Sequence, residues 1–153
     1  MDTLIKKNNN TTKEMDKMTI ELYTEGSYSG ARKCYGFAYL IVLNGKEIYC
    51  DDGTQNNLRY QAQWNLAGKT AAVLQGLKWI KEHHPEAHVE LHYSYEGVAN
   101  WLEYKWVAKS ILAREYVSMY NNYYKGMITS YIQENKSSSS VHYHQVKRMA
   151  SIV

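Results

Sequence analysis

Histidine and aspartate residues whose spacing suits metal or phosphate chemistry occur at three places in this sequence. His83-His84 lie side by side, but adjacent residues on a helix point apart and no third ligand follows, so we expect a helix end. Asp51-Asp52-Gly53 resembles the opening of a calcium loop without its later ligands, and we expect a turn. His142 and His144 alternate ahead of two basic residues, a pattern that suits phosphate contact and a solvated strand edge equally well.

Basic residues are concentrated in the C-terminal third of the chain. Residues 1–104 hold 11 Lys or Arg and 13 Asp or Glu, whereas residues 105–153 hold 7 and 2. Such a segment suits a polyanion or a solvated helix face. Tyrosine is abundant, at 15 residues against one Phe, and Tyr116, Tyr120, Tyr123 and Tyr124 gather on one expected helix. On that helix, tyrosine side chains are suited to the wall of a hydrophobic core, to a partner interface or to stacking on bases.

The composition, 44% hydrophobic and 22% charged over 153 residues, is that of one globular domain. No apolar run approaches the roughly 18 residues of a membrane helix, so we predict no membrane partner. The polar run Asn8–Thr11 does not suit a signal peptide. Cys34 and Cys50 lack metal spacing and are interpreted as reduced thiols of an intracellular, cytoplasmic protein. Residues 1–17 are predicted to form a flexible arm ahead of a domain over residues 18–153.

Alternating polar and apolar residues predict an opening meander of three strands. The first covers Thr19–Thr24, and Gly26–Gly30 follows as a turn. Asn44-Gly45 is a preferred two-residue hairpin turn and predicts antiparallel strands over Cys34–Leu43 and Lys46–Cys50.

The remaining elements alternate between helix and strand after a polar connection over residues 51–63. Helical spacing runs from Leu66 to His84, where Pro85 stops it, and His88–Tyr93 alternates as a fourth strand. Two helices are expected over Glu96–Leu102 and Val107–Tyr124, and a fifth strand over Val141–Val146. The order β-β-β-α-β-α-α-β predicts one mixed sheet with helices packed on it.

Four short motifs, in this order, resemble those of bacterial-type ribonucleases H. Tyr23–Tyr28 is similar to their first-strand Thr-Asp-Gly-Ser, and Asn65–Ala72 resembles the start of their central helix. His92–Val98, with Trp101 and Trp106, is similar to the fourth-strand block, and Val146-Lys147 to a Val-Lys-x-His turn. The resemblance spans about Met18 to Ala150. It implies an α/β ribonuclease H-like fold with a five-stranded mixed sheet and a truncated final helix.

Members of that family cleave the RNA strand of an RNA–DNA hybrid with two Mg²⁺ ions held by four carboxylates. At the matching positions Glu25 replaces Asp, Lys69 replaces Glu and Ser94 replaces Asp. The fourth acid is expected in a final helix beyond Val153, and Met149 stands at the place of the histidine of the turn. One carboxylate cannot hold two ions. The resemblance therefore implies a degenerate member without an intact catalytic set or a metal cofactor, Mg²⁺ being needed only by a residual activity.

The residue types at positions 69 and 25, Lys69 and Glu25, suggest a further hypothesis. If the central helix begins beside the first strand, the two side chains form a partly buried ion pair in which the ammonium replaces the charge of a metal ion. Two separately solvated side chains are the alternative.

Three functions follow from these observations. The first is a nucleic-acid-binding protein without catalysis, which binds RNA or an RNA–DNA hybrid. The second is a structural or adaptor subunit of a larger assembly, and the third is a residual metal-dependent nuclease that uses Glu25 and an imported ligand such as Glu96. For the first, the expected nucleic-acid contacts are Gly26, Ser27, Gln63, Asn65, Lys105, Lys109, Arg114, Lys147 and Arg148.

Overall fold

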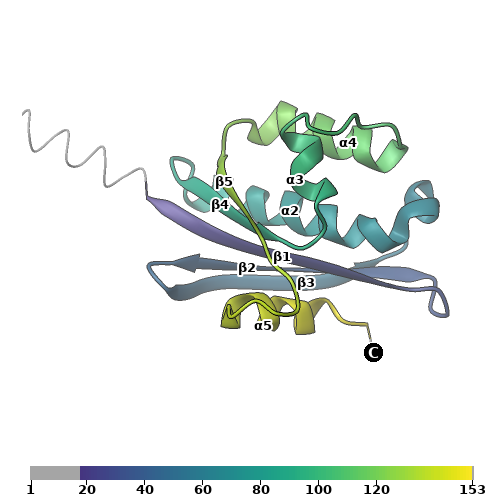
Figure 1. Cartoon of the computed structure of the whole chain (residues 1–153), viewed down its shortest axis with the longest axis horizontal. Helices are drawn as coiled ribbons and strands as arrows, with labels where there is room; N and C mark the ends of the chain where they lie inside the picture. The colour runs from purple at the N-terminus through teal and green to yellow at the C-terminus, as the bar shows by residue number, and fades with distance from the viewer. Residues whose placement is uncertain (1–17, 153) are drawn as a thin grey trace, which may run out of the picture.

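The computed structural model describes residues 18–152 and contains one five-stranded mixed sheet with helices on both faces (Figure 1). Its strands are β1 (Thr19–Ser29), β2 (Cys34–Leu43), β3 (Lys46–Gln55), β4 (His88–Tyr93) and β5 (Ile128–Gln133). They lie in the order β3-β2-β1-β4-β5, with an antiparallel β1–β2–β3 meander and with β4 and β5 parallel to β1. The expected α/β fold class is confirmed. The arm predicted over residues 1–17 lies outside the described residues.

The helices connect the strands and cover the sheet. They are the 3₁₀ helix η1 (Leu58–Gln63), α2 (Trp64–His83), α3 (Gly97–Leu102), α4 (Ile111–Met119) with its π-helical continuation η2 (Tyr120–Tyr124), and α5 (Val141–Ala150). None of these described helices has the length and apolar character needed to cross a bilayer.

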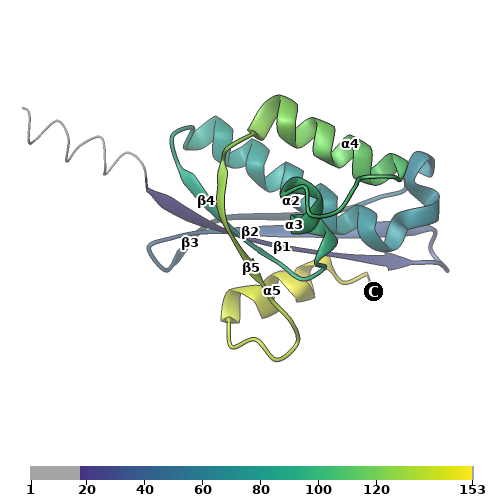
Figure 2. The same cartoon turned by 45° about the horizontal axis from the view of Figure 1, so that its top comes forward.

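Two hydrophobic layers hold these elements together, one on each face of the sheet. The larger lies between the sheet and α2, α3 and α4, and includes Leu22, Leu77 and Leu91. The smaller lies between the sheet and α5, and includes Tyr23, Leu40 and Val146. Figure 2 shows α5 alone on its face, reached by a long connection from β5. Alternate residues of β1 therefore serve different layers, because successive side chains of a strand point to opposite faces.

The C-terminal part of the chain differs from the sequence prediction. Residues 141–146 are not a strand, since the fifth strand is β5, and they form the first turns of α5. Tyr143, Val146 and Ala150 are the buried residues of α5, and their spacing is helical rather than alternating. The Ser140 hydroxyl accepts a hydrogen bond from the backbone N–H of Tyr143 at 3.1 Å, so the serine run ends in an N-cap. The final helix is thus present, and the predicted truncation is wrong.

Smaller differences concern the ends of the first hairpins. The strand β1 continues through the residues expected to turn, and the turn lies at Gly30–Lys33. Similarly, β3 extends to Gln55, and η1 occupies much of the predicted polar connection. The hairpin at Asn44-Gly45 is confirmed, with φ of 53° and 76°, the positive values that a tight primed turn requires.

Three glycines bring the start of α2 into backbone contact with β1 and β2. A Cβ atom on Gly68 would lie 2.0 Å from the carbonyl oxygen of Gly36 and 3.2 Å from the Cα of Gly26. A Cβ atom on Gly26 would in turn lie 2.3 Å from the backbone nitrogen of Lys69. The helix can approach this closely only because side chains are absent. As a result, the residue that follows Gly68 is placed directly over β1.

We expect Gly68→Ala to destabilise the fold by about 1–3 kcal/mol, because the new methyl group overlaps strand backbone that cannot move aside. Urea unfolding followed by circular dichroism measures the change. Gly30→Ala is the matched control, since nothing lies within 4 Å of a Cβ there, and it should be neutral or slightly stabilising. Equal stability of the two variants would contradict this account of the contact.

Candidate functional site

Three of the four positions expected to hold carboxylates meet at one point of the fold. Glu25 lies in β1, Lys69 in the second turn of α2, and Ser94 directly after β4. The parallel pairing of β1 with β4 and the close contact of α2 with β1 bring them together. Glu25 is 4% exposed, whereas the side chain of Lys69 keeps 22% of its surface exposed. The site is therefore closed around the carboxylate and partly open at the ammonium.

Lys69 and Glu25 form an ion pair, as the sequence hypothesis predicted. The Lys69 ammonium donates to Oε1 of Glu25 and lies 3.1 Å from Oγ of Ser94 and 3.5 Å from the carbonyl oxygen of Gly26. Ser94 in turn donates its hydroxyl to Oε1 of Glu25 at 2.9 Å. The backbone N–H of Gly26 donates to the same oxygen at 3.0 Å.

A fourth side chain, which the sequence analysis missed, completes the site from the other face of the sheet. Tyr143 of α5 donates its hydroxyl to Oε2 of Glu25 at 2.7 Å and is itself 2% exposed. The final helix was expected to supply the fourth acid, and its residue in contact with Glu25 is this tyrosine. Met149 was expected in a turn after a fifth strand; instead it lies in α5 and packs against the smaller hydrophobic layer. That placement of Met149 was wrong because the strand itself was misassigned.

The electrostatic balance of the site keeps Glu25 ionised. Burial by itself raises the pKa of this carboxyl, but the Lys69 ammonium and the hydrogen bonds from Lys69, Tyr143 and the Gly26 amide outweigh it, so the pKa is lowered from 4.5. The pKa of Tyr143 is raised, first by burial and then by its bond to the Glu25 carboxylate. Tyr143 is thus held as a neutral donor.

These residues do not fit the two Mg²⁺ ions that the family resemblance implies. A carboxylate offers about four lone-pair sites, and Glu25 receives donors from Lys69, Ser94, Gly26 and Tyr143. An ammonium and two hydroxyls surround it where acidic ligands are needed. Within residues 18–152 no group of three metal-ligating side chains includes Glu25. The arrangement therefore holds an ion pair in place rather than two metal ions.

Gly26 and Ser27, two expected nucleic-acid contacts, already have partners within the fold. The Gly26 amide is the donor to Glu25, and the Ser27 hydroxyl donates to the carbonyl oxygen of Ala150 at the end of α5. Their role toward nucleic acid stays a prediction.

Gln63 and Asn65 line two neighbouring hollows on either side of η1. Asn65 borders a hollow of about 410 Å³ together with Tyr28, Lys33 and Gln61. Gln63 borders one of about 290 Å³ beside Arg59 and the start of α4. Ala62 belongs to the lining of both, and the two hollows together are called the indented surface beside η1.

The five expected basic contacts lie on two sides of the molecule. Lys105, Lys109 and Arg114 are exposed on the segment that contains α4, whereas Lys147 and Arg148 are exposed in the last turn of α5. Since α4 and α5 cover opposite faces of the sheet (Figure 2), these cations do not form one cluster. Contact between each of these residues and nucleic acid stays a prediction.

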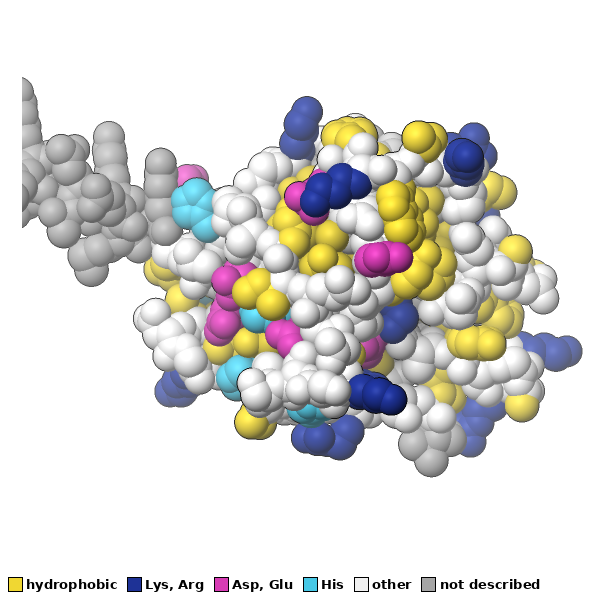
Figure 3. All heavy atoms as spheres, in the orientation of Figure 1, with side chains coloured by type: hydrophobic (Ala, Val, Ile, Leu, Met, Phe, Trp, Pro, Cys, Tyr) yellow, Lys and Arg dark blue, Asp and Glu magenta, His cyan; other side chains and the backbone are white. Residues whose placement is uncertain are grey.

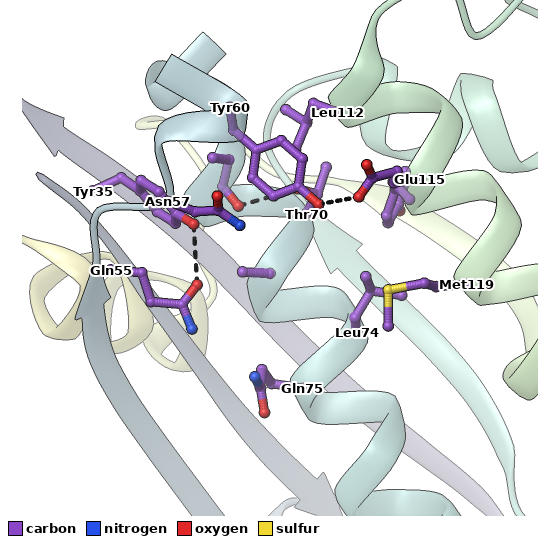
Figure 4. A pocket seen from close by; sticks show the side chains of 13 residues that line it. Tyr35, Gln55, Asn57, Tyr60, Thr70, Leu74, Gln75, Leu112, Glu115 and Met119 are labelled. Carbon is purple, nitrogen blue, oxygen red and sulfur yellow. Dashed lines mark hydrogen bonds between the residues drawn. The ribbon is translucent and has the colours of Figure 1, made fainter. Parts of the chain in front are cut away.

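A further cavity of about 230 Å³ lies between α2, η1 and α4 (Figure 4). Its polar groups largely satisfy one another: the Tyr35 hydroxyl donates to Gln55 at 3.1 Å, and the Tyr60 hydroxyl donates to Glu115 at 2.5 Å. Arg59 pairs with the same Glu115 and so ties η1 to α4. These bonds brace the helices around the cavity.

A group of ionisable side chains further along β1 and β4 was also not predicted from the sequence. Glu21, Glu90 and His92 offer ligand atoms within 4.8 Å of one another. The available signal was the alternation of His88, Glu90 and His92 along a predicted strand, which places them on one face. Figure 3 shows acidic and histidine side chains gathered on one face of the molecule.

Comparison with known proteins finds likeness in structure but not in sequence families. No family model matches the chain, and no curated protein is significantly similar to it. A ribonuclease H1 isolated from compost by a metagenomic approach superposes with a TM-score of 0.67 at 11% identity, over 86% of this chain and 91% of that one. Its structure in complex with an RNA/DNA hybrid gives 0.64 at 12% identity, over 85% and 90%. The holo form of a ribonuclease H domain from Desulfitobacterium hafniense gives 0.52 at 26% identity, over 86% of both chains.

These superpositions cover most of each chain. The chain therefore has the ribonuclease H-like fold, and the resemblance that the sequence motifs indicated is confirmed at the level of the fold.

We expect Lys69→Met to destabilise the fold by about 3 kcal/mol, because it leaves the buried Glu25 carboxylate without its cation. This figure is the lower end of the range for buried pairs, since part of Lys69 is solvated. Chemical unfolding measures it, and an unchanged midpoint would mean that the pair contributes nothing. Lys105→Met is the control, because Lys105 forms only an exposed pair with Glu103 at 3.6 Å and should matter little.

Glu25 should also make stability depend on pH in acid. Its pKa in the folded chain lies below the ordinary 4.5, so its contribution is fully present above pH 4.5 and is lost as the pH falls through the lowered value. The free energy of unfolding of the natural chain should therefore fall more steeply below pH 4.5 than that of Glu25→Gln. Measuring both variants across this range tests the sign. Parallel curves would rule out a strengthened carboxylate at this site.

Proposed function

We propose that this chain binds nucleic acid through a ribonuclease H-like fold and does not hydrolyse it. The observation that carries the absence of catalysis is the network around Glu25, in which Oε1 faces the donors of Lys69, Ser94 and Gly26 and Oε2 accepts from Tyr143. Hydrolysis by this fold family needs an open cluster of acids to bind two divalent ions. A fixed ammonium in the centre of the site opposes such ions by charge and occupies their place.

Binding of nucleic acid is supported by the indented surface beside η1. It carries groups that suit a sugar–phosphate backbone, namely the amides of Gln61, Gln63 and Asn65 and the ammonium of Lys33. Tyr28 borders it with 58% of its surface exposed, and an exposed aromatic ring can stack on an unpaired base. The similar ribonuclease H1 solved in complex with an RNA/DNA hybrid makes such a hybrid the first ligand to test.

An adaptor role is the second candidate, and exposed apolar side chains favour it. Tyr104, Val107 and Ile111 near the start of α4 are 69%, 76% and 44% exposed. Apolar surface of this kind is typical of a protein interface. In either role we place the protein inside the cell, an assignment supported by the two free thiols, Cys34 and Cys50.

The decisive measurement is the fluorescence anisotropy of a labelled RNA–DNA hybrid, RNA duplex and DNA duplex at two salt concentrations. We expect the hybrid or the RNA duplex to bind at low salt, with affinity falling steeply as salt rises because phosphate contacts release counterions. Absence of binding to all three at low salt would exclude this function and leave the adaptor role.

Lys109→Ala with Arg114→Ala should weaken this binding for every sequence and lower the salt slope by about one for each phosphate that is no longer neutralised. Lys46→Ala with Lys78→Ala removes two exposed charges elsewhere and is the matched control. Equal reductions in the affinity of the two proteins would indicate general electrostatic attraction rather than contacts from the segment that contains α4.

Incubation of the hybrid with the natural chain and Mg²⁺ or Mn²⁺ should give no cleavage, as judged by denaturing electrophoresis. The alternative of a residual nuclease assembled from Glu25 and Glu96 predicts cleavage that is lost in Glu25→Gln. Cleavage with that dependence would overturn the proposed absence of catalysis without affecting the binding result.

A further inference from the structure

A second group of ionisable side chains lies on the α5 side of the sheet, apart from Glu25. At its centre is the imidazole of His92 in β4, which is 5% exposed. Nδ1 lies 2.8 Å from Oε1 of Glu134, and Nε2 lies 3.0 Å from Oε2 of Glu90 and 3.7 Å from Oε1 of Glu21. One buried imidazole is thus surrounded by three carboxylates.

Backbone pairing and one aromatic ring hold this group in place. The parallel register sets Glu21 opposite Glu90 and Tyr23 opposite His92. The Tyr23 ring stacks on the imidazole, with centroids 4.0 Å apart and planes at 20°. Glu134 directly follows β5, and its backbone N–H donates to the carbonyl oxygen of Tyr93 at 2.7 Å. The side chains therefore come from three adjacent strands with little freedom to rearrange.

The contact with Glu134 orients the imidazole of His92. Nδ1 lies 2.8 Å from Oε1 of Glu134, so Nε2 is directed at the carboxylates of Glu90 and Glu21. Nε2 and one oxygen of each of these two carboxylates lie within 4.8 Å of one another, and all three are possible ligand atoms for a metal ion. A histidine whose other nitrogen donates to a carboxylate is the usual arrangement at metal centres.

The negative charge of the group also favours a bound cation. Within the described part of the chain, no lysine or arginine pairs with Glu21, Glu90 or Glu134. A doubly protonated His92 would offset only one of the three negative charges. The remaining excess would lie beside His92 and Glu134, both of which are buried. Burial of uncompensated charge is costly, and a bound cation removes that cost.

We propose that Glu21, Glu90 and His92 bind a divalent transition-metal ion of the Zn²⁺ type, with Glu134 as a positioning residue that orients His92. Bonds of about 2.0–2.2 Å set the ligand atoms of a tetrahedral site roughly 3.4 Å apart, and the two Nε2–oxygen distances, 3.0 and 3.7 Å, lie on either side of this value. An imidazole nitrogen is a poor ligand for Mg²⁺, which prefers oxygen atoms in an octahedron.

This site differs from the one around Glu25 and does not depend on the proposed nucleic-acid function. The two lie about 13 Å apart along β1, at a rise of roughly 3.3 Å per residue. Glu21 and Glu90 keep 31% and 26% of their side chains exposed, which leaves the fourth coordination position open to water. The ion would tie β1 to β4 and, through Glu134, to the end of β5.

The test is titration of the full-length, tag-free and chelator-treated chain with Zn²⁺ by calorimetry, and with Co²⁺ by visible absorption. We expect one tight site with the absorption of a low-symmetry Co²⁺ complex, and no displacement by Mg²⁺. His92→Gln should weaken binding more than 100-fold, whereas Glu134→Gln should weaken it about 10–100-fold and shift the Co²⁺ spectrum. A purely structural role for Glu134 would not move that spectrum.

The controls separate this site from other ligands. The double change His83→Gln with His84→Gln should leave the tight site within about threefold of the natural affinity. If His92→Gln does not fold by circular dichroism, Glu90→Gln replaces it, because that side chain is partly exposed and keeps its shape. No tight Zn²⁺ uptake by the natural chain, or equal uptake by Glu90→Gln, would overturn the proposal and leave His92 as a side chain held by hydrogen bonds to its carboxylates alone.

Discussion

The ion pair between Lys69 and Glu25 is the contact around which the fold is organised. It joins the first strand to the central helix, Ser94 joins it to β4, and Tyr143 joins it to α5, so both faces of the sheet meet at one carboxylate. A buried carboxylate is tolerated only when its charge and its hydrogen bonds are satisfied. Each neighbouring element supplies one donor, and the positions of these elements are therefore mutually dependent.

Much of this arrangement could be predicted from the sequence, because the relevant signals are local. The Asn44-Gly45 turn fixes the hairpin, alternation identifies β4 to the residue, and helical spacing ending at Pro85 identifies α2. Motif order then placed Glu25, Lys69 and Ser94 together, and the structure brings these three side chains into contact. Short-range pattern and family resemblance were sufficient where both pointed to the same element.

The C-terminal segment shows where local pattern fails. Residues 141–146 alternate over one short stretch, and a helical spacing of Tyr143, Val146 and Ala150 becomes visible only over ten residues. Because this segment was predicted to be a strand, Tyr143 was not expected in the site and Met149 was expected in a turn. The group around His92 was missed for another reason: its members come from β1, β4 and the end of β5, and only strand order and register bring them together. Alternation along β4 places Glu90 and His92 on one face, but the pairing that adds Glu21 and Glu134 leaves no local trace in one sequence.

The bond from Tyr143 to Glu25 spans 118 residues of chain and has a consequence for synthesis. As the protein leaves the ribosome, β1 emerges early and α5 late, so Oε2 of Glu25 lacks its donor until most of the described chain has been made. Contacts between such distant segments slow folding, because a long loop must close before they form. The smaller hydrophobic layer stays open to solvent during the same interval. A nascent chain would accordingly expose Leu40 and Val42 on that face, which makes it a natural substrate for chaperones that bind apolar strands.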